Sequence, residues 1–205
     1  MSQLSHQESF WKGAFGTEYI KRNADDKKII PTNTALFAKI FANRPAPESF
    51  LELGSNIGMN LIALHLLFPN AGIDAVEIND EAFEQVSKLD FVKAYHQSLF
   101  DFQPKGKVDC AFTKGVLIHQ APESLPAIYQ LLYEASKKYI LVCEYYNPSP
   151  VEVSYRGHSA VLFKRDFAGE MLDAYPDLRL VDYGFVYHRD NAFPADDYTW
   201  FLMEK

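Results

Sequence analysis

A glycine-bearing turn and a later carboxylate stand where a nucleoside-binding site would need them. The stretch from Ser49 to Asn60 is typical of a buried strand, a turn with Gly54 and Gly58, and the start of a helix. A second apolar run, Ile73 to Asn79, carries Glu77 at its end. Glycine lets the backbone approach a ligand closely because it has no Cβ. A carboxylate after the second strand can accept hydrogen bonds from ribose hydroxyls. The pair predicts a nucleoside-containing cofactor.

The spacing of the turn separates two kinds of cofactor. A dinucleotide-binding turn has glycine at its first, third and sixth positions, which here hold Gly54, Asn56 and Met59. Only the first position fits, so a nicotinamide enzyme is disfavoured. The pattern is an acid within the strand, Glu52, followed by Gly54, Asn56 and Gly58. It resembles the first motif of class I S-adenosylmethionine-dependent methyltransferases, in which the middle glycine is replaceable.

This resemblance implies S-adenosylmethionine as the cofactor and S-adenosylhomocysteine as the product. The Gly54–Gly58 turn would run under the amino-acid end of the cofactor, Glu77 would hold the ribose, and Ile78 would pack on the adenine. The edge of the adenine would be bound just after the third strand, by Ser98, Leu99 and Phe100. The site below the sulfonium would be lined after the fourth strand, by Lys114, Gly115 and Val116.

An aromatic-rich N-terminal segment precedes these motifs. Tyr19, Arg22 and Asn23 recur at roughly helical spacing and are candidates to cover the carboxylate of the cofactor. Trp11 and Phe15 would form the apolar underside of a lid, where Trp11 could also contact the substrate. The alternative is an amphipathic helix docked on the edge of the sheet, and both interpretations stay open.

Candidate catalytic residues follow the fourth and fifth predicted strands, because an acceptor in this fold approaches over the carboxyl ends of the strands. His119 is a candidate general base, since its ordinary pKa lies near neutrality; packing near the next helix is an equal alternative. Glu144, Tyr145 and Tyr146 follow the fifth strand. Tyrosine pairs more often pack than react, whereas an acid directly after a buried strand is harder to explain as surface.

Four potential cations gather in a short segment of an otherwise acidic chain: Arg156, His158, Lys164 and Arg165. A solvated loop and helix start would explain them. A site for a carboxylate or phosphate of the acceptor would also explain them, since arginine suits bidentate binding of such groups. We favour the anion site, because cations at a predicted helix start are electrostatically out of place.

The elements that must position these residues alternate between strands and helices, which indicates a mostly parallel sheet. We predict an α/β, Rossmann-like, seven-stranded sheet with helices on both faces and an antiparallel C-terminal strand pair. Residues 1–48 are predicted to form a helical lead-in or lid, and residues 49–205 the cofactor-binding domain. Pro31 is expected to divide the lead-in into two helices, with Thr32 or Asn33 as a cap. The remaining helices are predicted over 59–68, after a cap at Asn79 or Asp80, over 122–135 and over 164–175.

Composition limits the partners and the compartment. The chain has 205 residues and a formal charge of −7, which argues against a nucleic-acid or anionic-membrane partner. Its two cysteines, Cys110 and Cys143, lie in apolar runs and indicate buried free thiols of a reducing compartment. With no signal-peptide pattern and no membrane-length apolar run, we expect a cytoplasmic protein with a small-molecule acceptor. No metal-site spacing is found, and the sequence is silent on oligomeric state.

A further set of motifs is spread over nearly the whole chain, at residues 10–16, 19–23, 52–60, 113–119, 143–148, 155–158 and 163–167. They resemble those of a narrower group, the methyltransferases associated with pseudaminic acid biosynthesis. This resemblance implies an association with nonulosonic sugar pathways and does not by itself establish the acceptor. The leading hypothesis is methyl transfer to a small, anionic acceptor such as a nonulosonic sugar precursor or sugar nucleotide. The competing hypothesis is a non-catalytic protein of the same fold that binds the cofactor or a partner.

Overall fold

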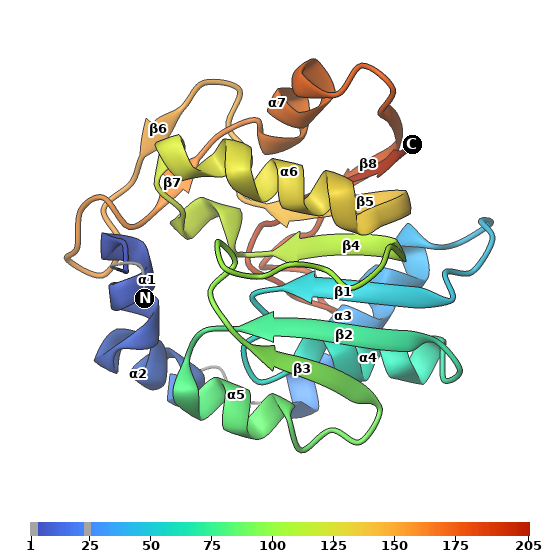
Figure 1. Cartoon of the computed structure of the whole chain (residues 1–205), viewed down its shortest axis with the longest axis horizontal. Coiled ribbons are helices and arrows are strands. Elements are labelled where there is room, and N and C mark those ends of the chain that lie inside the picture. Colours follow the sequence, from blue (N-terminus) through green and yellow to red (C-terminus); the bar gives the residue numbers. More distant parts are fainter. Residues whose placement is uncertain (1–3, 23–25) are drawn as a thin grey trace. The chain divides into compact units, whose positions relative to one another are not determined.

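The computed structural model describes residues 4–22 and 26–205. The chain divides into two compact units, Met1–Gln103 and Pro104–Lys205, whose elements are labelled in Figure 1.

The first unit opens with three helices and continues as two strand–helix–strand crossovers. Its strands run in the order β3-β2-β1 and pair in parallel, with Phe50 beside Ile73 and Val76 beside Tyr95. Its elements are α1 (His6–Lys12), α2 (Ala14–Arg22), α3 (Asp26–Ile40), β1 (Ser49–Leu53), α4 (Met59–Leu67), β2 (Gly72–Glu77), α5 (Asp80–Val86) and β3 (Val92–His96).

Helices α3 and α4 pack on each other and, in Figure 1, lie together behind β1 and β2. Phe37 and Ile40 of α3 are buried, as are Leu61 and Leu64 of α4. Phe50 of β1 is fully buried. Removing such apolar area from water is the main favourable term in folding. This packing fixes the strand from which the glycine turn emerges.

The second unit places its strands in the order β4-β5-β9-β8. Strands β4 and β5 are parallel, whereas β9 is antiparallel to both β5 and β8. Helix α6 packs on β4 and β5 (Figure 1). The elements are β4 (Val108–Lys114), the 3₁₀ turns η1 (Leu117–His119) and η2 (Pro122–Ser124), α6 (Leu125–Ala135), β5 (Ser136–Glu144), β6 (Val151–Glu152), β7 (Phe163–Lys164), α7 (Phe167–Ala174), β8 (Arg179–Phe185) and β9 (Thr199–Glu204).

The predicted fold class is confirmed. Strands β1–β5, β8 and β9 make up a seven-stranded, mostly parallel sheet with an antiparallel C-terminal pair. The small β6–β7 ladder was not expected. Its strands have two residues each, which is too short for an alternating pattern to be recognised.

The prediction that Pro31 divides the lead-in was wrong, because α3 runs through it from Asp26 to Ile40. Proline removes one backbone donor and crowds the preceding turn. Pro31 lies near the N-terminus of the helix, so the missing hydrogen bond falls in its first turns. The ring of Pro31 is exposed. The buried side chains further along, such as Phe37, hold the helix in place. Tertiary packing therefore overrides the local signal.

The predicted helix over 164–175 begins later than expected. Lys164 belongs to β7, and Asp166 is the N-cap of α7, where its carboxylate accepts a hydrogen bond from the Gly169 amide at 2.8 Å. Lys164 and Arg165 thus precede the helix. Neither residue is therefore a cation in the first turn of a helix.

Both cysteines are buried free thiols. Among residues 4–22 and 26–205, no cluster of three or more histidine, cysteine or acidic side chains could hold a metal ion. In the same residues, no helix is long and apolar enough to cross a membrane.

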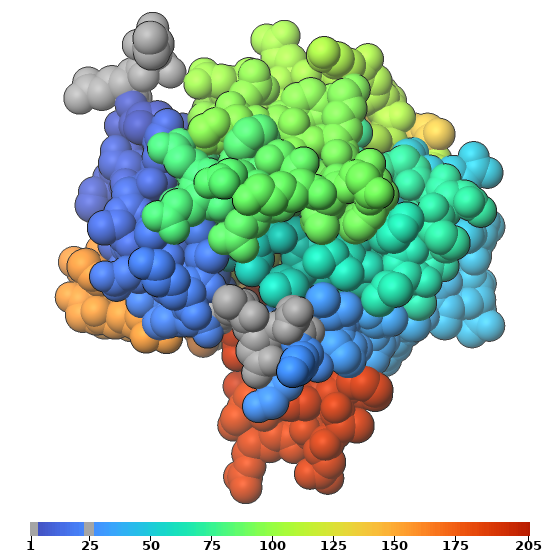
Figure 2. Space-filling view, turned by 90° about the horizontal axis from the view of Figure 1, so that it is seen from below, coloured from blue at the N-terminus to red at the C-terminus, as the bar shows by residue number. Residues whose placement is uncertain are grey.

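The lead-in helices dock tightly within the first unit. Helix α2 contacts α5, and Figure 2 shows the dark-blue N-terminal helices against the green segment of the same unit. Gly16 makes this possible, because a Cβ there would overlap the carbonyl oxygen of Trp11 and lie 2.9 Å from the Asn79 side-chain nitrogen. The sequence needs glycine at this position for packing.

We expect Gly16→Ala to lower the free energy of unfolding by about 1–3 kcal/mol, because the added methyl enters filled space. Gly72→Ala is the matched control: a Cβ at Gly72 meets nothing within 4 Å, so its effect should be near zero or slightly stabilising. Urea denaturation followed by tryptophan fluorescence measures both. Equal stability of the two variants would contradict the proposed fit of α1 and α2.

Candidate functional site

The turn after β1 has a backbone conformation that suits the glycines and the asparagine of its sequence. Gly54, Asn56 and Gly58 all have positive φ, at 77°, 49° and 84°. Glycine adopts this region without strain, and asparagine tolerates it better than most residues. The amides of Gly54 and Ser55 donate to the Val76 carbonyl at 2.9 and 3.1 Å. The turn is therefore tied to the neighbouring strand β2.

Glu77, at the end of β2, holds the same turn through its carboxylate. One oxygen accepts from the Asn56 amide at 2.6 Å, and the other accepts from the amides of Ile78 and Asn79 at 2.8 and 2.7 Å. The side chain is buried. Burial raises its pKa, and the three backbone donors oppose that rise. A carboxylate has about four acceptor positions, so one position on the oxygen that faces Asn56 remains.

Two buried polar atoms in the turn have no hydrogen-bond partner among the described residues: the Ser55 hydroxyl and the Asn56 side-chain oxygen. Ser55 is 3% exposed. A buried polar group without a partner costs free energy, and native structures seldom keep one without a reason. These atoms are suited to a polar ligand lying against the turn.

Glu52 lies below the turn in the core and is 0% exposed. Its carboxylate accepts a hydrogen bond from the Asn60 amide nitrogen at 2.5 Å, and the Asn60 oxygen accepts one from Asn33 at 2.8 Å. This chain of contacts joins β1, α4 and α3. These contacts give Glu52 a structural role beside the turn after β1. Direct contact of Glu52 with the cofactor stays a prediction.

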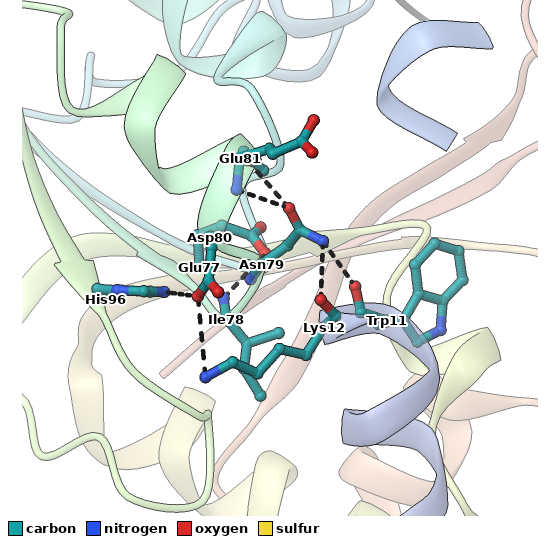
Figure 3. Close-up of polar contacts among 9 residues, drawn as sticks. Trp11, Lys12, Glu77, Ile78, Asn79, Asp80, Glu81 and His96 are labelled. Carbon is teal, nitrogen blue, oxygen red and sulfur yellow. Dashed lines mark hydrogen bonds and ion pairs between the residues drawn. The ribbon is translucent and has the colours of Figure 1, made fainter. Parts of the chain in front are cut away.

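Asn79 connects the start of α5 to the lead-in, as Figure 3 shows. Its side-chain oxygen caps α5 by accepting from the amides of Glu81 and Ala82 at 3.0 and 3.1 Å. Its nitrogen donates to the carbonyls of Trp11 and Lys12 at 3.0 and 3.3 Å. One amide side chain thus joins the end of α1 to the start of α5.

Asp80 adds an exposed ion-pair cluster to the same junction (Figure 3). Its carboxylate lies 3.0 Å from His96 Nε2 and 3.8 Å from Lys12 Nζ. Exposed pairs of this kind add little stability. The junction therefore depends mainly on Asn79.

Ser98, predicted at the adenine edge, is buried after β3 and donates to the Glu8 carboxylate of α1. Burial raises the Glu8 pKa, but hydrogen bonds from Ser98 and Ser5 outweigh it and leave the pKa lowered. The Ser98 hydroxyl also accepts from the Phe100 amide at 3.1 Å. Leu99 is half-buried and Phe100 is 39% exposed. The lead-in therefore already contacts the predicted adenine region.

The predicted lid residues form an aromatic cluster. The rings of Trp11 and Tyr19 meet edge-on at 5.3 Å, and the Arg22 guanidinium lies 5.3 Å from the Phe15 ring centroid. Asn23 lies outside the described residues.

A smaller contact places α2 directly on the turn after β1. Ile20 of α2, Ile57 of the turn and Ala82 of α5 form one buried apolar cluster. The lead-in thus packs against the turn after β1, and its predicted cover over the cofactor carboxylate stays a prediction.

In the second unit, Glu144 repeats the arrangement of Glu77. It is buried at the end of β5, and its carboxylate accepts from the amides of Val116, Leu117 and Ile118 at 3.1, 3.1 and 3.4 Å. Burial raises its pKa to about 7 against these donors. The carboxylate holds the loop after β4, and its catalytic role stays a prediction.

His119, in η1, is 7% exposed. Its Nδ1 lies 2.7 Å from the Val161 carbonyl, and since a carbonyl only accepts, Nδ1 carries the proton. Burial lowers the pKa to about 4 despite that bond. An imidazole with so low a pKa has little driving force to take a proton at neutral pH. The packing alternative suits this environment better than the general-base hypothesis.

Residues predicted after β4 and β5 come together around a tyrosine that sequence reasoning missed, Tyr198. The rings of Tyr145 and Tyr198 stack at 5.0 Å, and Lys114 Nζ lies 4.7 Å from the Tyr198 ring centroid. Gly115, with φ of 70°, leaves room for the Tyr198 hydroxyl. Tyr146 instead points to the exterior, 41% exposed and near Phe201.

The four predicted anion-site cations are dispersed. Arg156, with φ of 50°, and the exposed His158 lie in a hairpin turn closed by the Tyr155–His158 bridge. Arg165 pairs with Glu170 at 2.7 Å. Lys164 lies 5.0 Å from the Tyr145 ring centroid. Of the four, only Lys164 is placed at the tyrosine stack.

Sequence reasoning missed three residues of these sites. Asn79 was named only as a helix cap, although its side-chain nitrogen can also donate hydrogen bonds to another segment. Ser55 lay inside the motif but carried no signal beyond its position. Tyr198 precedes the last strand, where only the antiparallel pairing with β5 reveals its neighbours.

Comparisons with known proteins define the fold. No protein-family model and no curated protein matches the chain. A Burkholderia thailandensis 1,6-didemethyltoxoflavin-N1-methyltransferase, solved with 1,6-didemethyltoxoflavin and S-adenosylhomocysteine, aligns with a TM-score of 0.71 at 16% identity, covering 100% of this chain and 92% of that one. The Synechocystis PCC 6803 magnesium protoporphyrin IX methyltransferase with S-adenosylmethionine gives 0.67 at 13% identity, covering 100% of both chains. DhpI with S-adenosylhomocysteine gives 0.65 at 19% identity, covering 98% of both.

The chain therefore has the Rossmann-like fold of class I S-adenosylmethionine-dependent methyltransferases.

The buried His119 makes stability depend on pH in a defined direction. The unfolded chain binds a proton with a pKa near 6.5, whereas burial lowers the folded pKa to about 4. Between these two pKa values the unfolded state binds more protons than the folded state. The contribution of His119 to the free energy of unfolding is therefore present above pH 6.5 and is lost as pH falls toward 4. We expect the stability advantage of wild type over His119→Gln to shrink by roughly 3 kcal/mol across this window.

Urea denaturation of both proteins at several pH values measures this difference. Glu144 acts in the opposite direction: its folded pKa of about 7, raised by burial, gives stability that is present below 4.5 and is lost as pH rises toward 7. Glu144 is present in both proteins, so the difference between their free energies of unfolding reports on His119 alone. A difference that stays constant from pH 6.5 to 4 would refute the assignment.

Proposed function

We propose that the protein binds S-adenosylmethionine on the first unit and transfers its methyl group to a small, anionic acceptor. The observation that carries the proposal is the turn after β1, where Ser55 and Asn56 present buried polar atoms with no partner in the described chain. Glu77 fixes that turn from β2. The similar structures were solved with S-adenosylmethionine or S-adenosylhomocysteine, which supports the same class of cofactor here.

Glu77 would bind the ribose through the acceptor position that its three backbone donors leave. This geometry favours one hydroxyl as the direct partner rather than two. Ser55 and Asn56 would meet polar atoms of the amino-acid portion of the cofactor, which the resemblance places over the turn. Ile78, half-buried beside them, would pack on the adenine.

The lead-in would close over the bound cofactor. Three independent contacts support this: Asn79 with the α1 carbonyls, Ser98 with Glu8, and the apolar cluster of Ile20 with Ile57. All three join the lead-in to segments that follow β1, β2 or β3. Closure of this kind excludes water from the cofactor and orients it.

The cofactor supplies a methyl group on a sulfonium, which transfers by in-line displacement. Such a step needs alignment above all, and a base only if the acceptor atom carries a proton. The loop after β4, held by Glu144, would supply that alignment through the fixed positions of Lys114, Gly115 and Val116. His119 would support this loop by its bond to Val161.

For the acceptor, we propose a nonulosonic sugar precursor or sugar nucleotide of the pseudaminic acid pathway. The support is the sequence resemblance carried by stretches such as 113–119 and 155–158. The alternative, a non-catalytic protein of this fold, is favoured by one observation: both Glu144 and His119 are occupied by backbone groups. Formation of S-adenosylhomocysteine from S-adenosylmethionine and a pathway intermediate separates the two hypotheses.

Ser55→Ala tests cofactor binding most sharply. Removing a buried hydroxyl that has no partner should leave the stability of the ligand-free protein unchanged or raised. If the hydroxyl binds the cofactor, affinity for S-adenosylhomocysteine should fall by about tenfold, the scale of one hydrogen bond. Calorimetric titration and thermal unfolding measure the two quantities.

The matched control is Ser87→Ala, in the same unit, where the hydroxyl is exposed and donates only to the Glu84 carbonyl at 3.2 Å. It should bind S-adenosylhomocysteine like wild type. Wild-type protein that binds neither S-adenosylmethionine nor S-adenosylhomocysteine would overturn the proposed function.

A further inference from the structure

The C-terminal hairpin of the second unit keeps an apolar face exposed. Its strand β8 lies at the edge of the sheet, beside β9. Tyr183 is 65% exposed and Phe185 is 53% exposed, and Leu180 and Tyr187 are each exposed by somewhat less than half. Scattered exposed apolar residues are normal, but a row of large ones along one strand indicates an interaction site.

A bulge in β8 brings three of these side chains to the same face of the sheet. The register of β8 on β9 shifts between Leu180 and Asp182. Positions 180 and 183 would point to opposite faces of a regular strand, and the bulge removes that difference. Leu180, Tyr183 and Phe185 therefore share a face, and Tyr183 lies opposite Phe201 of β9.

Ring contacts extend this face across three strands. The centroid of the Phe201 ring lies 6.4 Å from that of Tyr183 and 5.8 Å from that of Tyr146, which follows β5. Along the chain, the ring centroids of Phe185 and Tyr187 are 6.2 Å apart. We call the whole set the outer patch: Tyr146, Leu180, Tyr183, Phe185, Tyr187 and Phe201.

The charged residues of β8 and β9 lie on the other face. Arg179 pairs with Glu204, and Asp182 pairs with Leu202. Glu204, Leu202 and Trp200 share one face of β9, and the buried Trp200 marks that face as the interior one. In these two strands, which the structure describes throughout, no charged side chain therefore belongs to the outer patch. Depletion of charge together with enrichment in tyrosine and phenylalanine is the composition of an interface core.

The size of the outer patch suits an interface with a second copy of the chain. An aromatic side chain contributes about 150–250 Å² of surface, and about half of it is exposed in most members of the patch. The patch thus presents on the order of 500 Å². A standard interface buries about 800 Å² on each partner, and a homodimer interface is about 65% apolar. The apolar part of such an interface is therefore as large as the patch.

We propose that the outer patch packs face to face on the outer patch of a second copy of this chain, around a two-fold axis near Tyr183. Tyr183 has Leu180 and Phe185 on either side along β8 and Phe201 across from it, so an axis there gives the two patches the greatest overlap. Each patch is then its own complement, and no charge is buried without a partner. This dimer goes beyond the proposed methyl transfer and does not depend on it.

Burial of apolar surface would drive this association. The chain carries a formal charge of −7, so two copies repel each other, and salt screens that repulsion. Screening does not weaken apolar burial. The dimer should therefore persist or strengthen as the salt concentration rises, whereas a contact built on ion pairs would weaken.

Analytical ultracentrifugation of the full-length protein without ligand measures the association. We expect wild type to sediment as a dimer at micromolar concentration, at low and at high salt. Tyr183→Glu and Phe185→Glu place a charge in the apolar contact and should each weaken dimerisation about a hundredfold or more. The control is Leu66→Glu on α4, because Leu66 is 63% exposed, like Tyr183, but belongs to the first unit. This control should dimerise like wild type.

A mixed sample tests the two-fold arrangement. Tyr183→Lys should be monomeric alone, because like charges meet near the axis, and should dimerise when it is mixed with Tyr183→Glu, because the charges are then opposite. A dimer that Tyr183→Glu leaves intact, a mixture that stays monomeric, or an equal loss in Leu66→Glu would overturn the proposal. A monomeric wild type would also overturn it and would leave the outer patch to an unlike partner protein. Circular dichroism confirms that each variant is folded.

Discussion

The first unit depends on one buried carboxylate, that of Glu77, and its three backbone donors. A buried charge is expensive unless hydrogen bonds satisfy it, and here the Asn56, Ile78 and Asn79 amides do so. These donors come from the turn after β1 and from the start of α5. The carboxylate therefore fixes two loops to the end of β2 at once. The glycine turn, the α5 cap and the docking of the lead-in all follow from that arrangement.

The second unit uses the same physical device at the end of β5. Glu144 accepts from three successive amides after β4, and the loop that it holds carries Gly115 against Tyr198. In each unit an acid at the carboxyl end of a parallel strand fixes the loop after a neighbouring strand. Backbone held in this way is preorganised, so a ligand would meet a surface that needs little ordering on binding. The two acids thus shape the proposed cofactor and acceptor sites through the loops that they hold.

The fold could be predicted from the sequence because local sequence patterns indicate its strands, helices and turns. Apolar strands, helical periodicity and the turn glycines predicted the seven-stranded sheet, and Asn79 was recognised as a possible cap. The prediction for Pro31 failed because distant contacts decide there: packing holds α3 together through the proline. The partners of Glu144 and Tyr198 depend on strand register, which no local pattern contains. The residue types at the sites were therefore predictable, but the hydrogen bonds that decide their roles were not.

Amide hydrogen exchange tests, residue by residue, whether Glu77 organises the proposed cofactor site. In the free protein, the amides of Asn56, Ile78 and Asn79 should exchange slowly, although the turn after β1 has little regular structure, because the carboxylate holds them. Saturating S-adenosylhomocysteine should slow exchange further in the turn and in the lead-in helices α1 and α2. Rapid exchange of these three amides in the free protein, or no change on addition of S-adenosylhomocysteine, would contradict the account.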